Sequence, residues 1–139
     1  MTVAIRHDAP ADIRAIVRRS PVWAVPGAVE TLRQCLFRSI EVCYGLVDNE
    51  VACVWGLITP THLSTSAYIW LLTTDIAAEH KFLLVRHSQR YVEEALKKFP
   101  SIIGDCIVGD YRAVRWLKWL GAEFMEPVDG RVPFTIRKK

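Results

Sequence analysis

The run from Ala67 to Thr73 constrains the fold most, because it is apolar almost throughout and follows a polar loop. Such a run is typical of a central strand whose two faces are both covered. An amphipathic helical pattern begins after Asp75 and stops at Pro100, and Ile102 to Val108 has the character of another buried strand. A buried strand, a long helix and a second buried strand predict an α/β fold with a central mixed β-sheet flanked by helices.

Two short polar turns predict hairpins in the same sheet. Asp48 to Glu50 separates the apolar runs Val42–Val47 and Val51–Ile58. Asp129 and Gly130 form the strongest short hairpin signal in the chain. They separate two further predicted strands, 122–126 and 132–136.

Helix signals fill most of the remaining chain. Asp8 is a candidate N-cap before a first helix, with Pro10 in its first turn, and Gly27 opens a second helix whose apolar face is predicted to reach Ile40. Tyr111 to Leu120 predicts a late, aromatic-rich helix closed by a glycine. With a short opening strand, the predicted order is strand, two helices, three strands, helix, strand, helix and two strands.

The composition indicates one packed domain, 1–139, and excludes several classes of protein. Of the 139 residues 51% are hydrophobic, and 18 basic against 15 acidic residues give a net charge of +3 that is spread along the chain. This bias is too weak to indicate specific nucleic-acid binding. The four cysteines lie in apolar runs with no Cys-x-x-Cys pair, so we expect no metal site and no disulfide framework. Without a signal peptide or a membrane-spanning run, the protein is expected to be cytoplasmic at synthesis.

The predicted element order resembles the GNAT acetyltransferase fold over essentially the whole chain. Ile5, Arg6 and Asp12 resemble the opening strand and helix of that family. Its late helix is resembled by Ala113, Leu117, Leu120 and Gly121. The resemblance implies acetyl-CoA as cofactor. In active members its pyrophosphate lies on backbone N–H groups at the start of the long helix, in a glycine-rich loop.

The segment that corresponds to this loop, 75–81, does not have the family's usual residues. No glycine occurs between Gly56 and Gly104, and Asp75 and Glu79 bring negative charge to the place of a diphosphate. Many active members also have a tyrosine that protonates the leaving thiolate, where this chain has Leu117. We therefore expect a GNAT-like protein without catalytic activity and without a bound cofactor.

A narrower resemblance is to the podophage internal virion protein A group, phage proteins with a degenerate GNAT-like fold. It rests on Trp70 to Asp75, on His80 to Phe82, and on Arg115 to Gly121 followed by Ala122 to Phe124. It implies a phage-encoded protein, made in the host cytoplasm, that acts in virion assembly or as a minor virion component. Its partners would be phage structural proteins or further copies of itself.

The alternative is an active acetyl-CoA-dependent N-acyltransferase with an atypical cofactor loop. In that case the backbone of Leu72, Thr73 and Thr74 would hold the cofactor, and Asp75 or Glu79 would act as general base. The simpler interpretation is that Thr74 or Asp75 is only the N-cap of the next helix.

The late helix carries the predicted partner-binding residues, which are Tyr111, Arg112, Arg115, Trp116 and Trp119. Aromatic rings beside guanidinium groups are the usual composition of an interaction hot spot. At least one of the two tryptophans is expected to be exposed in the isolated chain and to be covered by a partner.

Overall fold

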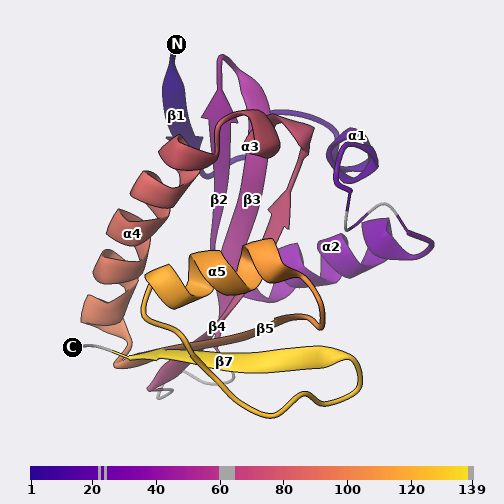
Figure 1. Ribbon diagram of the computed structural model, residues 1–139. Helices are drawn as coiled ribbons and strands as arrows, with labels where there is room; N and C mark the ends of the chain where they lie inside the picture. The colour runs from indigo at the N-terminus through magenta and orange to yellow at the C-terminus, as the bar shows by residue number, and fades with distance from the viewer. Residues whose placement is uncertain (22, 24, 60–64, 138–139) are drawn as a thin grey trace. The chain divides into compact units, whose positions relative to one another are not determined.

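Figure 1 shows the computed structural model of the chain, which describes residues 1–21, 23, 25–59 and 65–137. Its elements in chain order are β1 (Val3–Arg6), α1 (Ile13–Arg18), α2 (Ala28–Arg38), β2 (Ser39–Val47), β3 (Glu50–Ile58), β4 (Ser66–Thr73), α3 (Asp75–Glu79), α4 (Lys81–Lys98), β5 (Ser101–Ile107), α5 (Tyr111–Trp119), β6 (Glu123–Phe124) and β7 (Arg131–Arg137).

Within the described residues, seven strands form one sheet in the order β1-β2-β3-β4-β5-β7-β6. The pairs β1–β2, β2–β3, β5–β7 and β6–β7 are antiparallel, whereas β4 and β5 are parallel. A mixed sheet with helices between its strands confirms the predicted α/β fold class. The chain divides into two compact units that share β4: Met1–Ile58 with Trp70–Lys81, and Thr59–Ile69 with Phe82–Lys139. The extent of one domain over 1–139 stays a prediction.

The first unit is built on the hairpin of β2 and β3. Val47 lies opposite Glu50, and the two residues between them have left-handed backbone angles, with φ 49° at Asp48 and 67° at Asn49. This is the two-residue turn that suits the twist of paired strands, so the predicted hairpin is confirmed. The core of this unit includes Ile16, Leu32, Leu46, Val54, Trp70 and Leu72, all at most 5% exposed.

The first helix starts later than predicted. The side chain of Asp12 accepts a hydrogen bond from the Arg14 N–H at 2.8 Å and so caps α1. Asp8, the predicted cap, instead forms an ion pair with Arg6 at 2.6 Å. The predicted end of the second helix was also wrong. Its apolar face was expected to reach Ile40, but Ile40 lies in β2 and is 59% exposed.

The second unit contains the parallel pair and the C-terminal hairpin. Ile102, Phe134 and Ile136 are at most 3% exposed and form part of its core. Asp129 and Gly130 both have positive φ, and Val128 and Arg131 bond to each other across them, which confirms this turn. β6 is shorter than the predicted strand and ends at Phe124, although Met125 N still donates to the Pro133 carbonyl of β7 at 3.0 Å.

The single long helix predicted after Asp75 is wrong, because two helices stand in its place. α3 ends at His80, whose φ of −130° and ψ of 40° are not helical, and α4 starts at Lys81. Neither Pro nor Gly stands at the break, so no local signal marks it. The N-terminal end of α3 is bonded to the first unit, whereas α4 from residue 82 onward belongs to the second.

The four cysteines lie mostly inside the protein, as their apolar surroundings in the sequence indicate. Cys43, Cys53 and Cys106 are buried and Cys35 is half-buried. Burial raises the pKa of the Cys53 thiol to about 12, so this group stays protonated and unreactive at neutral pH.

Candidate functional site

The segment 75–81, which the family resemblance matches to the cofactor loop, contains α3 and the first residue of α4, and its first part follows β4. Thr74 is the N-cap of α3, with extended backbone angles and a side chain that is almost fully buried. Its Oγ1 donates to the Val51 carbonyl at 2.6 Å and accepts from the Ile76 N–H at 3.3 Å. The simpler of the two interpretations of Thr74, a helix cap, is thus what the geometry shows.

The backbone N–H groups at this end of α3 are bonded to acceptors within the protein. Thr74 N donates to the Ala52 carbonyl at 2.9 Å, and Asp75 N donates to the Arg19 carbonyl at 3.0 Å. The Ile76 N–H goes to the Thr74 hydroxyl, and Ala77 N donates to the Thr74 carbonyl at 3.1 Å. These are the groups that a helix N-terminus normally offers to an anion.

An ion-pair cluster lies over the same helix end. Arg19 Nε contacts Asp75 Oδ1 at 2.9 Å, and Arg19 Nη1 lies 3.6 Å from Glu50 Oε1. The hydrogen bond from Arg19 holds the pKa of Asp75 below its usual range. Since a general base must take up a proton readily, a carboxylate with a lowered pKa is poorly suited to that role. Nothing in the sequence marks the pairing of Arg19 with Asp75, which lies 56 positions later.

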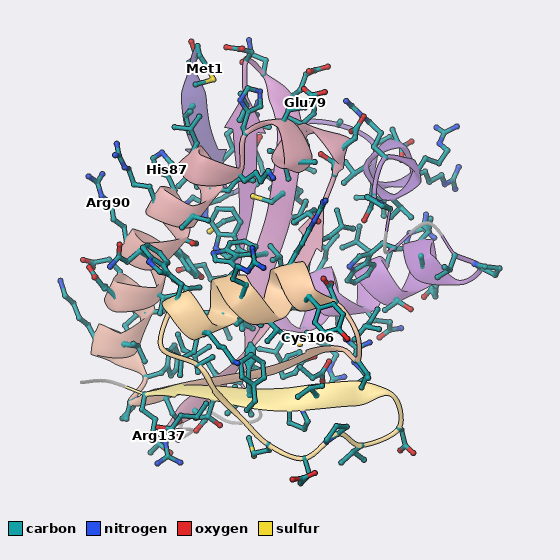
Figure 2. The ribbon with its side chains drawn as sticks, in the orientation of Figure 1. Met1, Glu79, His87, Arg90, Cys106 and Arg137 are labelled. Atoms are coloured by element: carbon teal, nitrogen blue, oxygen red, sulfur yellow. The ribbon has the colours of Figure 1, made fainter. Side chains whose placement is uncertain are left out.

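The other residues of the alternative interpretation are Leu72, Thr73 and Glu79, and their roles toward a cofactor stay predictions. The Leu72 side chain is fully buried in the core of the first unit, and Thr73 is half-buried at the end of β4. Glu79, labelled in Figure 2, is exposed at the far end of α3. The structure therefore brings together Thr74, Asp75 and the unpredicted Arg19 and Glu50.

A small hollow adjoins this cluster in the first unit. It has a volume of about 180 Å³, and its lining is largely apolar; the residues around it are Pro10, Ala11, Ala15, Ile16, Arg19, Asn49, Glu50, Val51 and Thr74. This space is smaller than the pockets that enclose most organic ligands. The hollow is therefore not a candidate cofactor site.

The predicted partner-binding residues all lie on α5 in the second unit. Tyr111 is 79% exposed and Trp119 is 54% exposed, and Arg112 and Arg115 are exposed as well. Trp116 differs, because its Nε1 donates to Ser88 Oγ of the neighbouring α4 at 2.9 Å. The expected exposure of at least one tryptophan is thus found at Trp119. Binding of a partner there stays a prediction.

The described parts of the chain contain no group of three or more His, Cys, Asp or Glu side chains placed to hold a metal ion. None of the helices within the described ranges is both long and apolar enough to span a membrane.

Comparison with known proteins gives matches at the level of structure. No protein-family profile matches the sequence, and a search of curated proteins found no match. A Bacillus subtilis acetyltransferase solved in complex with CoA superimposes with a TM-score of 0.72 at 11% identity, covering 99% of this chain and 100% of that one. The Escherichia coli ribosomal-protein-S18-alanine N-acetyltransferase gives 0.72 at 12% identity, covering 98% and 94%. A GNAT-family acetyltransferase from Bacillus anthracis gives 0.71 at 11% identity, covering 97% and 94%. From sheet order and these matches, the chain has the GNAT acetyltransferase fold.

Proposed function

We propose that this chain is a GNAT-fold protein that no longer holds acetyl-CoA at the start of α3 and that works by binding a partner protein. The observation that carries the proposal is the saturated helix start, where the N–H groups of residues 74–77 already have acceptors within the protein. A pyrophosphate could bind there only by displacing these bonds.

The charges and the length of α3 support the same conclusion. The carboxylates of Asp75 and Glu50 stand where an anionic pyrophosphate would have to approach, and Asp75 already occupies the Arg19 guanidinium. α3 has only five residues, so it contributes little helix dipole at its N-terminus. The start of α3 therefore does not fit the pyrophosphate of acetyl-CoA.

The positive part of the proposal is partner binding through α5. Its exposed aromatic and basic side chains have the composition of a protein-binding hot spot. The podophage resemblance suggests virion assembly as the setting, with a phage structural protein or a second copy as partner. Neighbouring genes for capsid, portal or tail proteins would support this setting, and a purely metabolic neighbourhood would count against it.

Calorimetric titration of acetyl-CoA into the protein tests the loss of the cofactor site. We expect no saturable binding below about 1 mM, the upper end of ordinary enzyme KM values. A dissociation constant in the micromolar range would overturn the proposal and return the acyltransferase alternative to first place.

A double variant, Asp75→Asn with Glu50→Gln, serves as the matched control. It removes the two carboxylates that pair with Arg19 at the start of α3 and leaves the backbone bonds in place. If these bonds are the obstacle, the variant also fails to bind acetyl-CoA. Tight binding by the variant alone would show that charge, and not bond saturation, excludes the cofactor.

A further inference from the structure

The outward face of α5 carries an aromatic–cationic–aromatic stripe. Tyr111, Arg115 and Trp119 are spaced four residues apart, so their side chains lie along one side of the helix. All three are exposed, the two rings by 79% and 54%. The spacing places a guanidinium between two aromatic rings.

Two further cations flank this stripe. Arg112 and Lys118 are exposed on either side of it, and the helix sequence contains no acidic residue. Asp110, the nearest carboxylate in sequence, is occupied as the N-cap and accepts from the Ala113 N–H at 3.2 Å. In the part of the chain that the structure describes, none of the three cations of α5 has an ion-pair partner.

The inner side of the helix is fixed in place. Trp116 bonds to Ser88, whose own hydroxyl donates to the Val85 carbonyl at 2.7 Å. The bond from Trp116 holds α5 against α4 within the second unit. The two helices lie beside each other in Figure 1. A helix held in this way loses little backbone entropy on binding, so the main entropic cost is the ordering of its exposed side chains.

We propose that the stripe Tyr111–Arg115–Trp119, with Arg112 and Lys118, binds an acidic amphipathic segment of a partner protein. Carboxylates of the partner would pair with the three unpaired cations, and its apolar side chains would cover the two rings. This assignment rests on the proposed function, since it names the class of partner that the chain binds.

The dimensions of the stripe favour a protein segment over a nucleic acid. Trp119 lies eight positions after Tyr111, so the helix rises about 12 Å between them. Three phosphate contacts over such a length would give weak, strongly salt-dependent binding. Arg90, labelled in Figure 2, projects from the side of α4 that faces away from α5, so it does not extend the basic surface.

Fluorescence anisotropy with a labelled amphipathic peptide of Glu and Leu residues tests the assignment. We expect saturable binding that Trp119→Ala weakens about 30-fold and Arg115→Ala about 10-fold, as at hot spots. Arg90→Ala is the matched control, because it removes one exposed positive charge outside the stripe and should leave the affinity unchanged. Circular dichroism of each variant confirms that the fold is retained.

Three results would overturn the assignment. They are absence of peptide binding, equal losses from Arg90→Ala and Arg115→Ala, and tighter binding of oligothymidylate than of the peptide. Titrating the same samples with acetyl-CoA separates this inference from the proposed function. If the protein binds acetyl-CoA and also binds the peptide through Trp119, only the loss of the cofactor site is refuted. If it binds neither acetyl-CoA nor the peptide, only the assignment of the stripe as a peptide site is refuted.

Discussion

Replacing Thr74 with alanine is expected to lower the free energy of unfolding by about 3 kcal/mol. The hydroxyl caps α3 by accepting from the Ile76 N–H, and it also donates to the Val51 carbonyl at 2.6 Å. Thr74 is only 2% exposed, so water cannot replace either bond. The variant therefore loses a helix cap and leaves two buried polar groups without a partner.

Urea denaturation of matched variants measures this effect. Thr74→Ser keeps the hydroxyl and should retain most of the stability. Asp12→Ala removes a cap of the same kind from α1, but Asp12 is exposed, so its loss should cost only about 1 kcal/mol. Equal losses from Thr74→Ala and Asp12→Ala would show that the buried bonds of Thr74 contribute nothing beyond an ordinary cap.

The two tryptophans of α5 are expected to respond in opposite ways to replacement by alanine. Trp116→Ala should lower the free energy of unfolding by about 3 kcal/mol, because it leaves a cavity beside α4 and removes the donor to Ser88. Trp119→Ala should change this free energy by less than about 0.5 kcal/mol, because its ring is 54% exposed.

Thermal and chemical denaturation of the two variants check this contrast. Ser88→Ala removes the acceptor of the Trp116 bond, together with the Ser88 bond to the Val85 carbonyl, without changing the Trp116 ring, and should cost about 1 kcal/mol. If Trp119→Ala were the more destabilising variant, the packed side of α5 would be the side that carries Trp119. Trp116 would then become the candidate binding residue.

The sequence predicted the parts of the fold that depend on local chemistry. Asp129 and Gly130 adopt positive φ and reverse the chain as expected, and Gly121, with φ 96°, follows the end of α5. The run from Ala67 onward is a strand inside the sheet, as its apolar sequence predicted. These features follow from backbone preference and hydrophobic pattern alone. The predicted cover on both faces of this strand is incomplete, because Leu71 is 37% exposed whereas both its neighbours in the chain are buried.

The features that were missed depend on contacts between distant parts of the chain. Arg19 and Asp75 meet only once α1 and the end of β4 are both in place. The break at His80 has no proline or glycine to mark it. The different surroundings of Trp116 and Trp119 follow from where α4 lies, which helical spacing on α5 alone does not reveal.

Amide hydrogen exchange at residues 74–77 measures whether these N–H groups are free. We expect the amides of Thr74, Asp75 and Ile76 to exchange slowly in the protein alone, as bonded groups do, and acetyl-CoA to leave their rates unchanged. Rapid exchange in the free protein that slows when acetyl-CoA is added would show an open anion site at the start of α3 and would refute the loss of the cofactor site.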